Sequence, residues 1–331
     1  MSSRFGADTL TLHDPDEAIE RIVRFLKTHS ERIGAKHLIV GMSGGVDSSV
    51  AAVLCSMAMG GRRTLGFCLS EDETRNPANI RDAEVVARKF GIKLETHDMT
   101  PIVKATTGVV HLSTGNAILP LGNVKARLRA MILYYYANTG NGLVVGTGDK
   151  SEVMLGYFTK YGDGASDIQP LGDLYKTTVR DMAKHLKLPA RIYSKQSSPE
   201  LWPGQTAEKE LGLAYEKLDL ILWGLERWIP PAEISRELAI PVKTVEGVRR
   251  RWLLAEHKRR PPQAMKLGFR TGSQDMRIPY SISILSESRA RPARQAKVRY
   301  PYCKCPARRT VSRLERAFGS QAGPQKWRPP S

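Results

Sequence analysis

Cysteine is scarce in this sequence, and long apolar stretches are absent from it. Four cysteines among 331 residues are too few for the disulfide framework that stabilises small secreted domains. Cys55 and Cys68 lie among apolar residues, which predicts buried free thiols. No apolar run approaches the roughly 18 residues that a membrane-spanning helix needs, and residues 1–16 lack the apolar core of a secretory signal. We therefore expect a soluble cytoplasmic protein without membrane contact.

Acidic residues are scarce in the last fifth of the chain. The formal net charge is +18, and residues 263–331 hold 15 Lys and Arg against 3 Asp and Glu. Beyond about residue 283 the apolar periodicity fades while Arg, Ser, Pro and Gln accumulate, which is typical of disordered segments. We expect a folded domain over residues 1–282 and a basic extension over residues 283–331.

Apolar periodicity predicts strands that alternate with helices in the first half of the chain. Short apolar runs predict strands at residues 37–40, 64–69, 92–96 and 143–146. Helical spacing predicts one helix directly after the first strand and others at residues 14–33, 77–90 and 123–137, the last capped by Asn123. This alternation is typical of a doubly wound α/β fold, in which helices cover both faces of a parallel sheet.

The second half of the chain has a different pattern. Apolar stripes predict helices at residues 207–228, 232–238 and 243–256, which indicate a helical C-terminal part. Glycine and proline are dense over residues 156–203, which we interpret as long loops of functional importance.

The strongest local motif is the loop from Ser43 to Ser49, with the sequence Ser-Gly-Gly-Val-Asp-Ser-Ser, between the first strand and the next helix. Gly44 and Gly45 permit a sharp turn and a close approach to a ligand. The amides at the start of the following helix favour an anion. Asp47 would repel a phosphate, so we expect it to bind Mg²⁺ instead. The alternative is a Gly/Ser turn that only caps a helix, and the Gly-Lys-Thr ending of a Walker A loop is absent.

The Ser-Gly-Gly-x-Asp-Ser pattern resembles the pyrophosphate loop of the ATP pyrophosphatases, which have the adenine nucleotide alpha hydrolase-like fold. That superfamily includes NAD synthetase, GMP synthetase, asparagine synthetase and tRNA lysidine synthetase. Its members cleave ATP between the α and β phosphates and activate an oxygen of the substrate as its adenylate. The loop by itself does not distinguish among them.

Motifs further along the chain make the distinction. Six segments in order and spacing resemble NAD synthetase over roughly residues 15–280. They are residues 122–127, 146–152, 158–164, 171–176, 201–206 and 256–259. The resemblance implies a ligase that amidates deamido-NAD with ammonia at the expense of ATP. It also implies a homodimer with the deamido-NAD site at the subunit interface.

The resemblance also implies roles for individual residues. The ATP-binding residues would be Gly41, Met42, Ser43, Gly44, Gly45, Val46, Asp47, Ser48, Thr147, Lys176 and Ser198. Those that bind deamido-NAD would be Arg127, Lys160, Asp167, His257 and Lys258. Asp47 and Glu152 would bind Mg²⁺, and the catalytic residues would be Asp47, Lys176 and Asp163, the last receiving a proton from ammonium.

The chemistry of this reaction agrees with these residue types. It joins two polyanions, so Mg²⁺ and several Lys and Arg side chains must neutralise their repulsion. An acyl-adenylate is easily hydrolysed, and the glycine-rich segment 156–172 is a candidate lid that excludes water. Some NAD synthetases take nitrogen from glutamine through a fused domain of several hundred residues, whereas 40 residues precede Gly41 here. We expect free ammonia as the donor, with a separate glutaminase chain left open.

Plainer interpretations stand beside these. Isolated lysines such as Lys160 are often only solvated, Glu152 could be an ordinary carboxylate at a helix start, and His257 could complement a helix dipole. Residues 234–252 faintly resemble a helix-turn-helix, but we interpret their apolar stripe of Val245, Val248 and Trp252 as packing.

Two rival functions remain open at this stage. One is a tRNA-modifying ATP pyrophosphatase, and the other is an inactive relative that binds nucleic acid. The basic extension, with Tyr300 and Tyr302 among its arginines, favours them slightly because phosphate contacts and stacked rings bind nucleic acid. We favour a solubilising role for it, and Cys303 and Cys305 make only a weak case for half a metal site.

Overall fold

A parallel sheet of four strands lies at the centre of the computed structural model, which describes residues 5–110 and 117–267. The strand order is β3-β2-β1-β4. The strands are β1 (His37–Gly41), β2 (Thr64–Ser70), β3 (Lys93–Asp98) and β4 (Gly142–Val145). Ile39 pairs with Leu65 of β2 on one side and with Val144 of β4 on the other. All four strands lie where the apolar runs predicted them.

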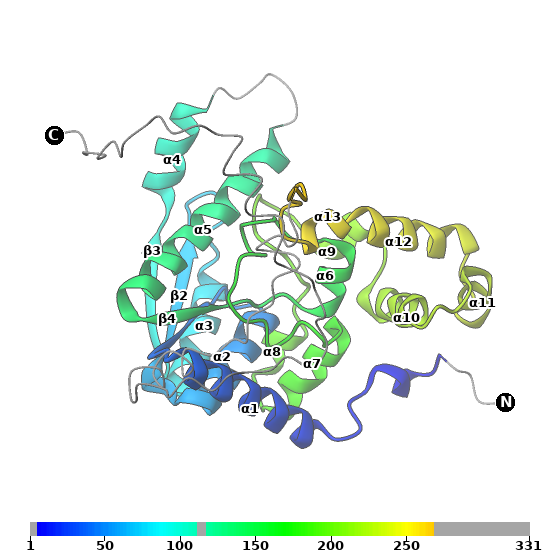
Figure 1. The fold of residues 1–331 in the computed structure, drawn as a ribbon, viewed down its shortest axis with the longest axis horizontal. Helices are drawn as coiled ribbons and strands as arrows, with labels where there is room; N and C mark the ends of the chain where they lie inside the picture. Colours follow the sequence, from blue (N-terminus) through cyan, green and yellow to red (C-terminus); the bar gives the residue numbers. More distant parts are fainter. Residues whose placement is uncertain (1–4, 111–116, 268–331) are drawn as a thin grey trace, which may run out of the picture. The chain divides into compact units, whose positions relative to one another are not determined.

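Helices cover both faces of this sheet, as the alternation predicted. Leu38 and Val40 point into one apolar cluster, with helices α1 (Pro15–Ile33) and α2 (Val46–Met59). Ile39 and Val144 point into another on the opposite face, where they meet Ala137 of α5 (Ile118–Gly140). Adjacent residues of a strand therefore belong to different layers, which confirms the doubly wound α/β class. Figure 1 shows the strands running behind α5.

Two of the three α-helices before the third strand begin at polar side-chain caps. The three are α1 (Pro15–Ile33), α2 (Val46–Met59) and α3 (Pro77–Lys89), with short 3-10 turns η1 (Ala7–Leu10) and η2 (Gly61–Arg63). The side chain of Asp14 accepts a hydrogen bond from the Glu17 amide at the start of α1, and Asn76 caps α3 in the same way. Both caps satisfy helix amides that otherwise have no partner.

The N-terminal boundary of the next long helix was predicted wrongly. Helix α5 spans Ile118–Gly140 and has Ala117 at its N-cap, so Asn123 lies inside it and does not cap it. The Asn123 side chain instead accepts a hydrogen bond from the hydroxyl of Thr159, at 2.7 Å. Helix α4 (Thr100–Val109) was not anticipated, because its threonines and proline disguise the helical pattern.

The glycine- and proline-rich segment also contains more helix than predicted. Within it the structure has α7 (Lys176–His185) and α8 (Ala190–Tyr193), and α6 (Lys150–Leu155) ends just before it. The predicted helix over residues 207–228 is broken at Gly212, whose φ of 74° ends one helix. The two pieces are α9 (Ala207–Leu211) and α10 (Tyr215–Glu226).

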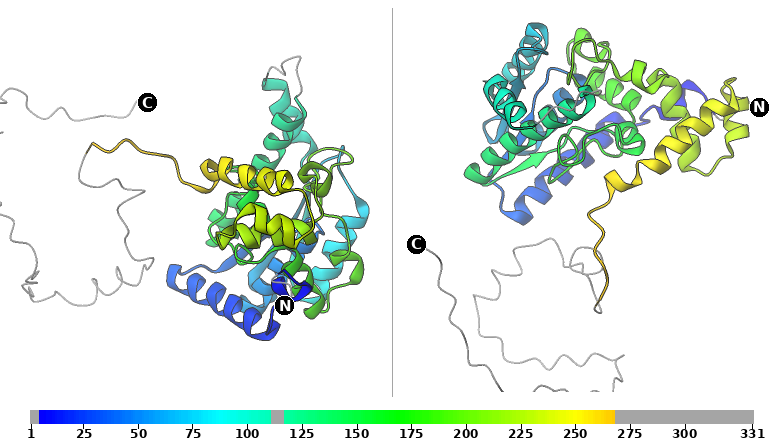
Figure 2. Two further views of the ribbon diagram at one scale, coloured as in Figure 1. Left: turned by 90° about the vertical axis from the view of Figure 1, so that its right-hand side faces the viewer. Right: turned by 90° about the horizontal axis from the view of Figure 1, so that it is seen from above.

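The last described helices form a layer with an apolar core of its own. They are α11 (Pro231–Glu237), α12 (Val242–Leu254) and α13 (Glu256–Arg259), and α11 and α12 pack against α10 (Figures 1 and 2). Val245 and Val248 are buried in this core and Trp252 packs against it, so packing explains their stripe. Phe5, near the start of the chain, is buried in the same core, where its ring meets that of Trp223 at 5.3 Å.

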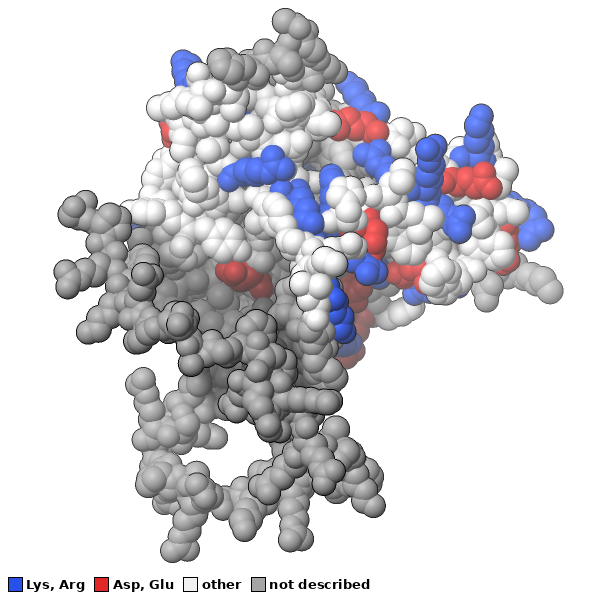
Figure 3. Space-filling view, turned by 45° about the horizontal axis from the view of Figure 1, so that its top comes forward, with Lys and Arg blue, Asp and Glu red and all other residues white. Residues whose placement is uncertain are grey.

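The predicted boundary at residue 283 and the basic extension 283–331 lie outside the described residues. On one face of the described part, lysine and arginine side chains are interspersed with acidic ones (Figure 3). Over residues 5–110 and 117–267, no helix is both long and apolar enough to span a membrane. Cys55 and Cys68 are free and buried, as predicted.

Candidate functional site

The Ser43–Ser48 loop connects the end of β1 to the start of α2. Gly45 occupies the N-cap of α2 and offers no side-chain hydrogen bond, so no side chain of the cap covers the first amides of this helix. Ser48 Oγ donates to the Gly45 carbonyl at 3.1 Å and accepts from the Ser43 amide at 3.2 Å. The hydroxyl of Ser48 thus shapes the loop around an uncapped helix start, which suits an anion.

Gly44 is essential to the path of this loop. Its φ of +80° is in the left-handed region, and a Cβ there would lie 2.1 Å from the carbonyl oxygen of Asn79 in α3. The Gly44 carbonyl accepts a hydrogen bond at 3.2 Å from Lys195, whose ammonium group also pairs with Asp82 at 2.7 Å. The loop is therefore held against α3 by backbone contact and by one lysine from after α8.

A second loop follows β4 and ends in a helix cap of a different kind. Asp149 is the N-cap of α6, and its carboxylate accepts a hydrogen bond from the Glu152 amide at 2.8 Å. Glu152 completes the capping box by accepting from the Asp149 amide at 3.4 Å. Asp149 is fully buried, and both carboxylates are fixed by the start of this helix.

Lys176, the first residue of α7, brings the two loops together. Its buried ammonium group lies 2.7 Å from Asp47, 2.8 Å from Asp149 and 2.9 Å from Glu152. Burial disfavours the charged lysine, but the three carboxylates outweigh it and raise the pKa of Lys176 well above its usual value. Burial, together with the charges of Asp149 and Asp47, raises the pKa of Glu152 to about 8, although Lys176 opposes the shift.

The acidic residues of this cluster fit a hard divalent cation. One oxygen from each of Asp47, Asp149 and Glu152 lies within 4.8 Å of the others. Oδ1 of Asp47 is buried and, in the described part of the chain, has no hydrogen-bond partner. Carboxylate oxygens are the ligands that Mg²⁺ prefers, and a buried oxygen without a partner is what such an ion would satisfy.

Asp149 was missed by the sequence analysis, although the sequence carried a signal for it. An aspartate three residues before a glutamate at the start of a helix has the spacing of a capping box, which places both carboxylates together. Lys195 was also missed, and its contacts with Gly44 and Asp82 join residues too distant in the chain for any local pattern to reveal.

The other expected ATP-binding residues lie at nearby strand ends and loops. Gly41 ends β1, Met42 is buried behind the loop, and Val46 begins α2. Thr147 follows β4 and is half-buried. Ser198 is exposed, in the same loop as Lys195, and its Oγ accepts a hydrogen bond from the Glu200 amide at 3.2 Å.

Four of the five residues expected to bind deamido-NAD lie together. The Arg127 guanidinium donates to the Lys160 carbonyl at 3.3 Å, and the Lys160 ammonium donates to the His257 carbonyl at 2.7 Å. Lys258 reaches back from α13 to the carbonyls of Gly156 and Phe158, each at 2.7 Å. The ring of His257 makes a 2.9 Å hydrogen bond with the Leu254 carbonyl, so it does interact with a helix end.

Asp167, the fifth of these residues, interacts with the sheet instead. Its carboxylate accepts hydrogen bonds from the Val144 amide at 2.8 Å and from the Tyr134 hydroxyl at 3.1 Å. Asp163, the expected proton acceptor, accepts from the Thr159 amide at 2.8 Å. Although the residue is exposed as a whole, the loop desolvates its carboxyl group, and this raises the pKa of Asp163.

The segment expected to be a lid is closely packed in the structure. A Cβ on Gly162 would approach Ala126 to 2.9 Å, and one on Gly164 would approach the ring of Phe158 to 2.4 Å. Its opening and closing remain a prediction.

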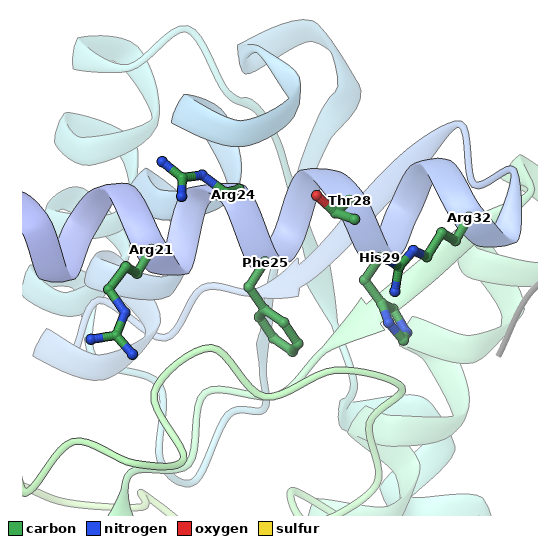
Figure 4. A pocket seen from close by; sticks show the side chains of 6 residues that line it. All are labelled: Arg21, Arg24, Phe25, Thr28, His29 and Arg32. Carbon is green, nitrogen blue, oxygen red and sulfur yellow. The ribbon is translucent and has the colours of Figure 1, made fainter. Parts of the chain in front are cut away.

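A separate hollow of about 400 Å³ runs along α1 and carries no site. Its lining side chains all come from that helix. They are Arg21, Arg24, Phe25, Thr28, His29 and Arg32. Figure 4 shows that the three arginines do not converge on a common point, so the hollow lacks the geometry of an anion site.

The fold and the site together define a class of protein. A glycine- and serine-rich loop after β1, with acidic groups and a buried lysine at the neighbouring strand end, indicates an α/β nucleotide-binding protein of the ATP pyrophosphatase class. The family model described as NAD synthase matches residues 18–262, and the chain belongs to that family.

Individual relatives agree with this assignment. The NH(3)-dependent NAD(+) synthetase of Methanocaldococcus jannaschii is 43% identical over 75% of this chain and 95% of its own length. That of Hyperthermus butylicus is 41% identical over 76% of this chain and 91% of its own length.

Solved structures extend the comparison to the fold. NMN synthetase from Francisella tularensis is 30% identical, with a TM-score of 0.68 over 77% of this chain and 100% of its own. NH3-dependent NAD synthetase from Campylobacter jejuni is 26% identical, with a TM-score of 0.65 over 76% of this chain and 100% of its own.

Proposed function

We propose that this chain synthesises NAD by the ATP-dependent amidation of deamido-NAD with ammonia. The observation that carries the proposal is Lys176, held by three carboxylates beside the uncapped start of α2. A fixed positive group next to an anion-binding loop is suited to a reaction that expels pyrophosphate. Membership of the NAD synthase family supports the choice of substrate.

The first step activates the nicotinate carboxyl group. A carboxylate oxygen attacks the α-phosphorus of ATP, the bond to the oxygen bridging the α and β phosphates breaks, and pyrophosphate leaves with that electron pair. The Ser43–Ser48 loop receives the leaving phosphates, and Lys176 stabilises the negative charge that develops on them. Thr147 and Ser198 complete the ATP site.

Mg²⁺ is the metal that we assign to the acidic cluster. Asp47 and Glu152 would hold it, with Asp149 beside them. When bound, it would neutralise phosphate charge. Lys176 already screens the three carboxylates from one another, so the cluster stays ordered around its own ammonium group.

The second step forms the amide. The nitrogen of ammonia attacks the acyl carbon of the adenylate, the carbon–oxygen bond to AMP breaks, and one proton is lost from nitrogen. We assign the proton that ammonium gives up before the attack to Asp163, whose raised pKa makes its carboxylate a better base, and the proton lost after the attack to the departing AMP phosphate. The packed segment around Gly162 and Gly164 excludes water from the adenylate.

The dinucleotide site is assigned to Arg127, Lys160, Asp167, His257 and Lys258. In the structure the ammonium groups of Lys160 and Lys258 donate to main-chain carbonyls. Each would bind a phosphate of the dinucleotide by exchanging a carbonyl hydrogen bond for one to a phosphate oxygen. The exposed positions of Arg127 and His257 give a ligand access from outside the chain.

We infer that a second copy of the chain completes this site. Helix α5, which carries Arg127, exposes large apolar side chains that a monomer would leave in water. They are Ile118 (55% exposed), Leu119 (59%), Met131 (53%) and Tyr135 (63%). Their burial in a homodimer would supply hydrophobic stabilisation next to the dinucleotide. Sedimentation velocity tests this inference, because Leu119→Glu with Tyr135→Glu should convert a dimer to a monomer.

The cytoplasm is the compartment that we propose. Cys55 and Cys68 are buried free thiols, which suits a reducing environment. The basic extension lies outside the described residues, and we keep a solubilising role for it.

The experiment supplies purified protein with Mg²⁺, ATP, ammonium and deamido-NAD and follows NAD, AMP and pyrophosphate. We expect the three products in equal amounts, with no turnover by Asp47→Ala and none when EDTA removes the metal. Glutamine in place of ammonium should give no NAD unless a glutaminase chain is added. Nicotinate mononucleotide is the essential competing substrate, because a solved relative is named NMN synthetase. A higher kcat/KM for the mononucleotide would overturn the assignment of the dinucleotide.

A further inference from the structure

Asp219 is a buried carboxylate that the proposed reaction does not use directly. It lies on α10 and is fully buried. Its Oδ1 accepts a hydrogen bond from the Ser151 hydroxyl at 2.6 Å, and its Oδ2 accepts from the amide and hydroxyl of Thr177, each at 2.9 Å. A buried carboxylate needs such donors, and here all three come from residues beside Lys176 or Glu152.

These bonds hold the first turn of α7, where Lys176 lies. Ser151 Oγ accepts a hydrogen bond from the Lys176 amide at 3.1 Å while donating to Asp219. The N-cap residue of α7, Tyr175, supplies no side-chain hydrogen bond. Asp219 therefore acts as a cap from another helix, directly at Thr177 and through Ser151 at Lys176.

The same helix also contacts the other end of the lysine. Tyr215, one turn before Asp219, has its ring centroid 5.4 Å from Nζ of Lys176. The ring is fully buried, so it is a fixed surface under the ammonium group. Helix α10 thus supports both the backbone and the side chain of Lys176.

We propose that Asp219 is a positioning residue that aims Lys176 at the three carboxylates and at the phosphates of ATP. The inference deepens the proposed function, since it rests on the role given there to Lys176. Carboxylates on two loops surround the ammonium group at 2.7 to 2.9 Å, so a small shift of α7 would break this arrangement. A displacement of about 1 Å can lower a rate by about 100-fold.

Asp219→Asn is the primary test, because it keeps the shape and removes the charge. The new amide NH₂ group would face another hydrogen-bond donor, either the Ser151 hydroxyl or the groups of Thr177. This clash of donors disturbs the start of α7. We expect kcat to fall by about 10- to 100-fold, while KM for deamido-NAD stays within about twofold because its site is on other segments. Circular dichroism and the unfolding midpoint establish that the variant is folded at the assay temperature. The matched control is Asp181→Asn, an exposed carboxylate on the same helix α7, which should retain kcat.

A second variant separates positioning from general stability. Ser151→Ala removes the connection to the Lys176 amide but leaves both Thr177 bonds to Asp219 in place. We expect a smaller fall in kcat than in Asp219→Asn, and a double variant whose loss is less than the product of the two single losses, because both act through one lysine. Ser151→Ala also carries the test if Asp219→Asn does not fold.

The outcomes distinguish this inference from the proposed function. If Lys176→Met retains full activity, Lys176 has no role in the reaction, and both the proposed function and the positioning role of Asp219 are wrong. Lys176→Met without activity, together with folded Asp219→Asn and Ser151→Ala that retain kcat, would overturn the positioning role alone. A fall in apparent kcat that matches the loss of folded protein, so that kcat per folded molecule is unchanged, would show that Asp219 only stabilises the fold.

Discussion

The two strand-end loops of the site are built in opposite ways. After β1, the chain turns on Gly44 and Gly45 and begins α2 with no side-chain cap. After β4, Asp149 and Glu152 close a capping box on α6. In the loop after β1, no N-cap side chain binds the helix amides. In the loop after β4, the carboxylates of Asp149 and Glu152 accept hydrogen bonds from the loop's own amides.

Because the two loops differ in this way, one edge of the sheet can bind both an anion and cations. Exposed amides at a helix start attract phosphate, and glycine is needed because the backbone itself must approach the ligand. Carboxylates that are already anchored by a capping box cannot swing away, so they stay near Lys176. The first loop supplies geometry through its backbone, and the second supplies charge through its side chains.

The largest effect is expected where the two loops meet, in Lys176→Met. Removing the ammonium group leaves the carboxylates of both loops without their cation, and breaking a buried ion cluster costs about 3–5 kcal/mol of unfolding free energy. NAD formation should be lost as well. Urea unfolding with and without Mg²⁺ checks the reason, since the metal should restore part of the stability of the variant but none of its turnover. Lys184→Met, at an exposed lysine of the same helix, is the control, and equal stability of the two variants would contradict the prediction.

The second-largest effect is expected in Gly44→Ala, in the Ser43–Ser48 loop after β1. The new Cβ would lie 2.1 Å from the Asn79 carbonyl at a φ of +80°, so we expect a loss of about 2–3 kcal/mol and a higher KM for ATP. Chemical denaturation and initial rates at varied ATP measure the two effects. A variant with native stability and native KM would mean that the loop does not need this path.

A smaller effect on stability is expected in the charged loop, in Glu152→Gln. Glutamine also serves at the third position of a capping box, so the start of α6 should persist and the unfolding free energy should change by less than about 1 kcal/mol. Replacing one carboxylate oxygen, a ligand that Mg²⁺ prefers, by an amide nitrogen should lower kcat by about 10-fold and weaken the response to Mg²⁺. A rate equal to that of the wild type would show that this carboxylate serves only as a cap.

The smallest effect is expected in Gly148→Ala, which pairs with Gly44→Ala. The nearest atom to a Cβ on Gly148 would be Glu152 Oε2 at 3.8 Å, an ordinary contact. We expect stability to change by less than about 0.5 kcal/mol, with native rates. A loss as large as that of Gly44→Ala would mean that both loops depend on their glycines, and the contrast between them would fail.

Sequence patterns predicted the layers of the fold because those layers follow local periodicity. Leu38, Ile39 and Val40 form a continuous apolar run, and the structure buries all three, on alternating faces of the sheet. The Ser43–Ser49 loop was equally visible, since its glycines and its position between strand and helix are local features.

Features that depend on distant contacts were not predictable in this way. Asn123 has the composition of a cap, but the apolar residues before it extend α5 by one more turn and Thr159 takes its side chain. Asp219 looks like a polar interruption of an amphipathic helix, and only the folded chain brings it against Thr177. Proline and glycine around α7 concealed a helix that tertiary packing stabilises.

The burial of Phe5 has a consequence for folding while the chain is being synthesised. Phe5 leaves the ribosome about 220 residues before Trp223 and Ile234, which share its native core. The growing chain must therefore leave this aromatic side chain outside its native core until helices α10 and α11 emerge. Closing so long a loop is slow and leaves apolar surface open to other chains meanwhile.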